Sequence, residues 1–118
     1  MEEYEVRDFI SKELSNFTFK RGTKGFKYLK EAIYICIIDI DAIENLTKSV
    51  FPKIANKYKE KSYFHVKWCI NQVINTMYNN TEIHKICNYF NLDENLKPSL
   101  KFIIYTIVCK YNKNNINN

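Results

Sequence analysis

Apolar residues recur at helical spacing along most of this 118-residue chain, in long segments separated by short polar breaks. The pattern predicts helices over residues 2–14, 25–38, 46–51, 52–58, 62–78, 81–90 and 98–111. The chain has only two glycines and two prolines, too few for the many tight turns of a β-sandwich or barrel. We therefore expect an all-α fold in one domain over residues 1–111. An asparagine-rich tail follows over residues 112–118, and we expect it to be disordered.

The stretch 52–78 contains a short helix, a polar break at residues 59–61 and a longer helix whose free N–H groups Ser62 can cap. One face of the longer helix is apolar and predicted to be buried, formed by Val66, Ile70, Val73, Ile74 and Met77. The opposite row carries lysine, amide and aromatic side chains, namely Phe64, Lys67, Trp68, Asn71 and Asn75, with His65 and Gln72 at its margin. Two helices joined by a tight turn, the second displaying such a row, are typical of a helix-turn-helix.

The formal charge of +5 is unevenly distributed. Residues 1–13 hold five acidic and two basic side chains, a net charge of −3, so the rest of the chain carries +8. Two basic clusters account for much of this charge: Lys20, Arg21, Lys24, Lys27 and Lys30, and then Lys53, Lys57, Lys59, Lys61 and Lys67. Such clusters beside a helix-turn-helix suit contact with phosphates. A solvated lysine-rich surface without a partner is the alternative.

Several classes of protein are disfavoured by what the sequence does not contain. No apolar run reaches membrane-spanning length and the first residues are unlike a signal peptide, so we expect a cytoplasmic protein without membrane contact. The four cysteines show no C-x-x-C spacing, which argues against a disulfide framework or a zinc site. There is no nucleophile–base constellation and no glycine-rich phosphate loop. We therefore expect a non-enzymatic protein with no catalytic residues, metal or cofactor.

Three segments carry a resemblance to a known family. Residues 25–33, GFKYLKEAI, resemble the G-x-x-Y-L-x-E-A-I opening of the DNA-binding effector domain of the master sporulation response regulator of endospore-forming bacteria. Residues 46–58 are similar to its I-T-K-x-L-Y-P-x-I-A-x-K-F, and residues 98–103 look like the P-x-x-S-x-F-I that begins its last helix. The resemblance covers nearly the whole chain. It implies a six-helix bundle with a helix-turn-helix that binds short promoter boxes, often as tandem copies, and activates or represses early sporulation genes.

The recognition helix departs from the family pattern R-V-E-R-A-I-R-H-A-I, because residues 65–74 here read HVKWCINQVI. The apolar register is retained, so the helix is expected to form and dock. Lys67 stands in place of the glutamate, Trp68 and Asn71 in place of arginines, and Gln72 in place of the histidine. Arginine pairs with guanine through two hydrogen bonds, whereas asparagine prefers adenine. We therefore do not expect the family's own box to be the target.

The leading hypothesis is a regulator that binds duplex DNA. We expect it to act as a stand-alone domain, because the chain contains no counterpart of the family's phosphoacceptor domain. Five lysines would contact phosphates, three amides would face bases and four further residues complete the surface: Lys53, Lys57, Lys59, Lys61 and Lys67, then Asn71, Gln72 and Asn75, then Ser62, Phe64, His65 and Trp68. Glu31 is expected to pair with nearby lysines.

Two alternatives stay open. In the first, the domain is a protein-interaction module that antagonises the full sporulation regulator. It would pair as a homodimer or heterodimer through the last helix or through the patch of Phe64 and Trp68. In the second, the basic and aromatic surface binds single-stranded RNA, with the aromatic side chains stacking on unpaired bases.

Overall fold

The computed structural model describes residues 2–93 and 96–116. These residues form seven α-helices and one 3-10 helix and contain no strand, in agreement with the predicted all-α class. In chain order the elements are α1 (Glu3–Leu14), α2 (Lys24–Ile38), η1 (Ile40–Asn45), α3 (Leu46–Ser49), α4 (Phe51–Lys57), α5 (Tyr63–Asn80), α6 (Ile83–Phe90) and α7 (Leu100–Ile116).

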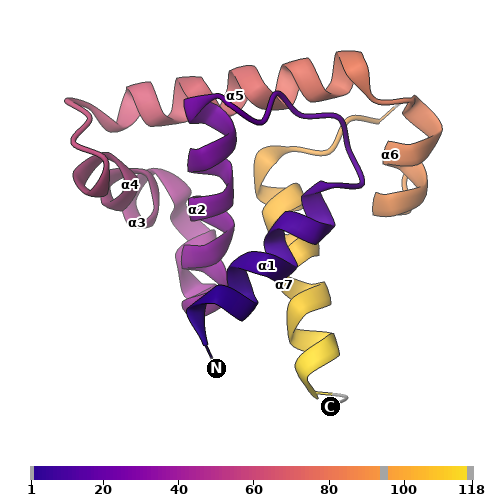
Figure 1. Ribbon diagram of the computed structural model, residues 1–118, viewed down its shortest axis with the longest axis horizontal. Helices are drawn as coiled ribbons and strands as arrows, with labels where there is room; N and C mark the ends of the chain where they lie inside the picture. The colour runs from indigo at the N-terminus through magenta and orange to yellow at the C-terminus, as the bar shows by residue number, and fades with distance from the viewer. Residues whose placement is uncertain (1, 94–95, 117–118) are drawn as a thin grey trace.

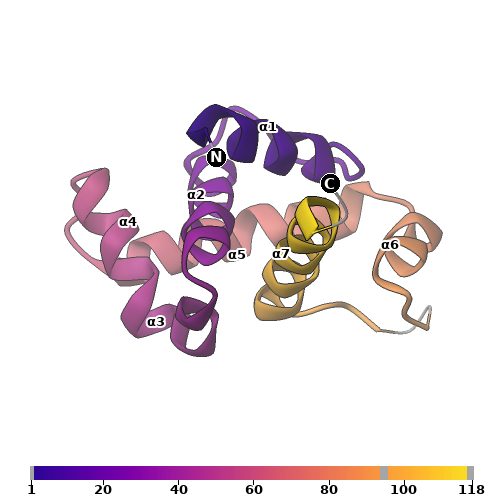
Figure 2. The ribbon, with the colours of Figure 1, turned by 90° about the horizontal axis from the view of Figure 1, so that it is seen from below.

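Helix α5 lies along one edge of the molecule, and α2 and α7 run away from it (Figure 1). Helix α1 crosses both α2 and α7 on one side, as the perpendicular view shows (Figure 2). The short helices α3 and α4 lie beside the N-terminal end of α5, and α6 lies beyond its C-terminal end (Figure 1). One flank of α5 is thereby packed onto the bundle, and the other is left without a covering helix.

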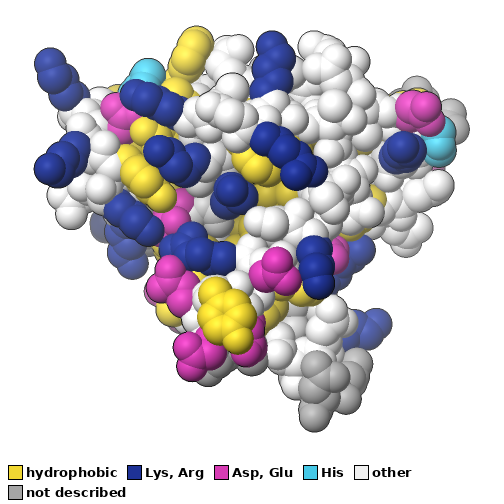
Figure 3. Space-filling model, viewed as in Figure 1, with side chains coloured by type: hydrophobic (Ala, Val, Ile, Leu, Met, Phe, Trp, Pro, Cys, Tyr) yellow, Lys and Arg dark blue, Asp and Glu magenta, His cyan; other side chains and the backbone are white. Residues whose placement is uncertain are grey.

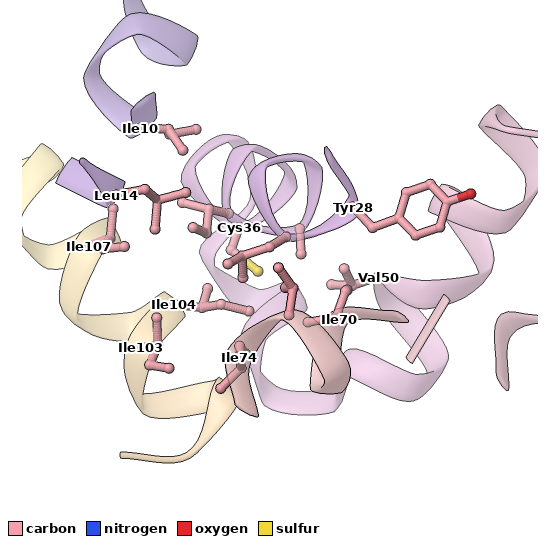
Figure 4. Close-up of a cluster of buried hydrophobic side chains, with 14 of the residues drawn as sticks. Ile10, Leu14, Tyr28, Cys36, Val50, Ile70, Ile74, Ile103, Ile104 and Ile107 are labelled. Atoms are coloured by element: carbon pink, nitrogen blue, oxygen red, sulfur yellow. The ribbon is translucent and has the colours of Figure 1, made fainter. Parts of the chain in front are cut away.

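The core forms where the apolar faces of these helices converge (Figure 4). Ile10 from α1, Ile70 from α5 and Ile104 from α7 are each at most 1% exposed. All five residues predicted for the buried face of α5 are buried, and Cys69 joins them. This packing fixes the rotation of α5 about its own axis, and so determines which side chains it presents to solvent.

Gly25 sets how closely α2 approaches α5. A Cβ atom at this position would lie 2.2 Å from the backbone oxygen of Cys69 and 3.0 Å from the Cβ of Val73. Distances this short to a helix backbone leave no room for any side chain. The glycine is therefore required for the first turn of α2 to contact α5 directly.

Glu31 is a buried carboxylate that joins three helices. Its oxygens accept hydrogen bonds from Arg7 of α1, with Nη1 at 2.9 Å, and from Nζ of Lys57 of α4 at 2.8 Å. Burial alone would raise the pKa of Glu31, but the hydrogen bonds from the two cations outweigh it and lower that pKa. The expected pairing of Glu31 with a lysine is confirmed. Its second partner, Arg7, was not predicted because it is far from Glu31 in the sequence.

A Glu31→Gln variant is expected to lose about 2 kcal/mol of unfolding free energy at neutral pH, because two charge-assisted hydrogen bonds weaken. The folded-state pKa of Glu31 lies below the ordinary value of 4.5, so its contribution is fully present above pH 4.5 and is lost as pH falls below it. The difference between wild type and variant should therefore shrink in acid. Urea unfolding across pH measures it, and a difference that stays constant into acid would contradict the assignment.

The helix predicted over residues 81–90 begins later, because Glu82 is the N-cap of α6 and makes no side-chain capping bond. Threonine is a residue type that predicts an N-cap, but the Thr81 hydroxyl oxygen instead accepts a 2.9 Å hydrogen bond from the backbone N–H of Thr18, which folds back against the end of α5. Ile83, in the first turn of α6, is 43% exposed.

Part of the tail that was predicted to be disordered, residues 112–118, is helical. Helix α7 continues to Ile116, so residues 112–116 are helical, while residues 117–118 lie outside the described part of the chain. Tyr111 is buried and holds this end of the helix against the core. The side-chain amide of Asn115 donates a 2.8 Å hydrogen bond to the backbone oxygen of Tyr111, four residues earlier in the same helix.

Candidate nucleic-acid interface

A tight turn connects α4 to α5. Pro52 lies in the first turn of α4, where its missing N–H costs nothing. At the end of α4, the N–H of Glu60 bonds to the oxygen of Ala55 at 2.8 Å and that of Lys59 to Asn56 at 3.4 Å, which is a Schellman motif. Ser62 then caps α5, since its hydroxyl oxygen accepts a 3.1 Å hydrogen bond from the N–H of Phe64. The predicted cap at Ser62 is confirmed.

Lys59 occupies the position of this motif where glycine is usual, with φ of 57°. A Lys59→Gly variant should raise the unfolding free energy by about 0.5–1 kcal/mol, because relief of left-handed strain exceeds the added freedom of the unfolded chain. Lys61→Gly is the matched control, since it removes the same charge at a position without positive φ. Thermal unfolding distinguishes them, and equal effects from both substitutions would refute the strain at Lys59.

The outward face of α5 consists of the side chains that the sequence singled out. Phe64 and Trp68 are 65% and 59% exposed. The Phe64 ring stacks on Tyr63 with centroids 4.4 Å apart, and the Trp68 ring lies nearly parallel to His65. The four polar members of the row are all exposed: Lys67, Asn71, Gln72 and Asn75. This face thus combines aromatic surface with amide donors and acceptors along one helix.

The predicted phosphate-contacting lysines divide into two groups. Within residues 2–93 and 96–116, no carboxylate lies within ion-pair distance of Lys53, Lys59, Lys61 or Lys67. Lys57 differs, because its ammonium group is bound to Glu31, and that hydrogen bond raises the pKa of Lys57. Because the charge of Lys57 compensates a buried carboxylate, only the other four of the predicted lysines remain available for contact with a phosphate.

Glu60, in the turn, is a residue that the sequence did not single out. Its carboxylate accepts a hydrogen bond from the Tyr28 hydroxyl and lies 3.4 Å from Nζ of Lys24 and 3.6 Å from Nε2 of His65. The hydrogen bond from Tyr28 is the main reason that the pKa of Glu60 is lowered. Its partners on α2 are more than thirty residues away, so no local pattern reveals them.

His65 is thereby placed differently from its neighbours on α5. Its Nε2 lies 3.5 Å from Sγ of Cys69 as well as close to Glu60, so the ring points toward the turn and α2. His65 is nevertheless exposed and lies parallel to Trp68, so it stands at the margin between the outward row and the turn.

Lysine and arginine side chains spread over α2, α4 and the near side of α5 in the space-filling view, whereas acidic side chains gather at the end of the molecule where α1 begins (Figure 3). On this face, most basic side chains therefore lie closer to α5 than the acidic group at the start of α1 does.

Other kinds of site find little support in the described residues. In residues 2–93 and 96–116, no group of three or more histidine, cysteine or acidic side chains converges as a metal site would require. All four cysteines are free thiols. No helix of the described chain combines the length and apolar character needed to cross a membrane.

Comparison with protein families gives one match. The family described as "Sporulation initiation factor Spo0A C terminal" matches residues 10–111, from the middle of α1 to Tyr111 in α7. The matched span includes α4, the turn and α5 in full. A comparison with curated proteins finds no match.

Proposed function

We propose, on the premise that this chain belongs to the family of the C-terminal domain of the sporulation initiation factor Spo0A, that it binds duplex DNA and regulates transcription of sporulation genes. Helix α4, the turn and α5 act as the helix-turn-helix, with α5 as the recognition helix in the major groove. The protein works by occupying its site, without catalysis, in the cytoplasm where the chromosome lies.

The outward face of α5 is the observation that carries this proposal. Asn71, Gln72 and Asn75 are exposed in a row that the buried opposite face holds in a fixed orientation. Asparagine and glutamine side chains can each donate to and accept from adenine in the major groove, so these residues would read A·T base pairs. Four lysines that have no carboxylate partner among the described residues would contact the bordering phosphates, namely Lys53, Lys59, Lys61 and Lys67.

Selection of bound sequences from a pool of random duplexes tests the proposal. We expect enrichment of A·T pairs within the contacted site and an affinity that falls as salt is added. Competition by the enriched duplex should exceed competition by single-stranded RNA of matched length. Preferential competition by the RNA would instead favour the stacking role that exposed Phe64 and Trp68 allow.

A protein-interaction role is the second candidate, and the surface of α7 favours it. Phe102 and Tyr105 are 38% and 49% exposed and line a hollow of about 330 Å³ together with Ile43 of η1. A second copy of the chain or the full sporulation regulator could dock here. Sedimentation of the purified protein with and without the full regulator separates the two roles, since an antagonist would form a stoichiometric complex and show no affinity for duplex DNA.

A further inference from the structure

The segment between α1 and α2, residues 15–23 and hereafter the connector, runs alongside α5 in the opposite direction (Figure 1). Near its start, the N–H of Thr18 bonds to Thr81 at the C-terminal end of α5. Just beyond its end, Gly25 lies against Cys69 and Val73, near the middle of α5. Between these anchors is a hollow of about 310 Å³ whose lining residues come from both segments, among them Lys20, Thr23, Lys24, Trp68, Gln72 and Thr76.

The connector is held rigidly although it has no regular secondary structure. Phe17 and Phe19 are buried, while Thr18 and Lys20 between and after them are exposed. At its end, the Thr23 hydroxyl donates a 2.8 Å hydrogen bond to the oxygen of Lys20 and accepts one of 3.3 Å from the N–H of Phe26. The end of the connector is thus a hydrogen-bonded turn, which fixes the backbone positions from which its side chains extend.

Two cations at this turn have no anionic partner. Lys20 and Arg21 are exposed, and no carboxylate in the described chain lies within ion-pair distance of either. Lys24 differs because it lies 3.4 Å from Glu60, and Lys27 and Lys30 lie over the rings of Tyr58 and Phe26. Of these two cations, Lys20 lines the hollow beside α5, and Arg21 lines a neighbouring hollow that shares Thr23 and Lys24 with it.

We propose that the connector is a second phosphate-contacting arm, in which Lys20 and Arg21 bind the backbone strand that borders the major groove occupied by α5. This inference rests on the proposed function of α5. An α-helix with its side chains is about 10–12 Å across and nearly fills a major groove about 12 Å wide. Groups held alongside the helix therefore meet the bordering phosphates rather than the bases, and the hollow gives that strand room to approach.

The same arrangement separates the two sets of phosphate contacts along the helix. Lys59 and Lys61, the lysines of the turn, lie at the N-terminal end of α5, and the connector lies beside the middle and C-terminal half of α5. Phosphate contacts at two separate positions along α5 would fix the angle at which this helix enters the groove. Contacts from a single cluster at one end would not fix that angle.

Fluorescence anisotropy with a labelled random-sequence duplex, titrated across salt, tests the arm. The variant Lys20→Gln/Arg21→Gln should show a slope of log K against log salt that is about 1.8 smaller in magnitude than wild type, equivalent to roughly 60-fold weaker binding at about 0.1 M salt. The matched control Lys101→Gln/Lys113→Gln removes the same charge from α7 and should change the slope by far less. Both variants alter exposed side chains, and circular dichroism checks that they fold.

The outcomes separate this arm from the function it rests on. Suppose that wild type binds with a salt-dependent affinity and that the connector variant has the same slope as the α7 control. This result would overturn the arm and leave α5 as the proposed reader. Wild type that shows no salt-dependent binding to any duplex would overturn both proposals at once.

Discussion

A Gly25→Ala variant is expected to unfold with about 3 kcal/mol less free energy than wild type, or to shift α5 on the bundle. The added Cβ would meet the backbone oxygen of Cys69 at 2.2 Å, and a helix backbone cannot give way as a flexible side chain can. Alanine in place of glycine would otherwise favour the first turn of α2. Any destabilisation therefore reports the contact between the helices rather than helix propensity.

Gly22→Ala is the control for this experiment. No atom lies within 4 Å of a Cβ built at Gly22, and its φ is not in the left-handed region, so the change in stability should stay within about 0.5 kcal/mol. Thermal and urea unfolding of both variants measure the difference. If the two alanines had equal effects, α2 would not approach α5 as closely as the structure shows.

Replacing the four unpaired lysines of the turn region by glutamine should abolish most DNA binding. Loss of four phosphate contacts lowers the magnitude of the salt slope by about 3.6, which corresponds to between 10³-fold and 10⁴-fold weaker binding at about 0.1 M salt. The four substituted positions are Lys53, Lys59, Lys61 and Lys67. The loss should be nearly independent of the duplex sequence, because phosphates carry no base information.

A variant with the same change in charge elsewhere provides the comparison. Glutamine at four lysines of α1 and α7 leaves the neighbourhood of α5 unchanged and should retain most of the affinity. The positions are Lys12, Lys101, Lys110 and Lys113. Equal loss from both variants would mean that net charge alone, rather than the placement of lysines beside α5, governs binding.

Local pattern was sufficient to predict much of this fold. The apolar spacing on α5 gave its buried face and therefore its outward row, and Ser62 was recognisable as a cap from its residue type and position. The same reasoning failed at Thr81, because its competing partner, the backbone of Thr18, is sixty-three residues away. Short-range rules predict which group needs a hydrogen bond, and tertiary contacts decide which partner supplies it.

The candidate site shows the same division. The exposure of Phe64 and Trp68 follows from helical periodicity. The pairing of Lys57 with Glu31 and of His65 with Glu60 instead depends on how α2 meets α4 and the turn. Charge counting treats every lysine as equal. Only the packed structure separates the lysine that compensates a buried carboxylate from those left for an external anion.

Departures in the recognition helix bear on specificity more than on affinity. The structure keeps α5 docked with its amides outward, so phosphate attraction through the lysines does not depend on which bases are read. Base preference would follow Asn71, Gln72 and Asn75, and the first two stand where the family pattern has an arginine and a histidine. A change of target site without loss of DNA binding is the expected consequence.

The claim that the outward face of α5 reads duplex DNA is tested most directly by nuclear magnetic resonance. Isotope-labelled protein would be titrated with the duplex enriched by selection, and the signals of Lys67, Asn71 and Asn75 followed. We expect the backbone amide signals of all three residues and the side-chain amide signals of Asn71 and Asn75 to shift most, while the signals around Phe102 and Tyr105 of α7 stay in place. Shifts confined to α7, or no shifts on α5 at saturating duplex, would contradict it.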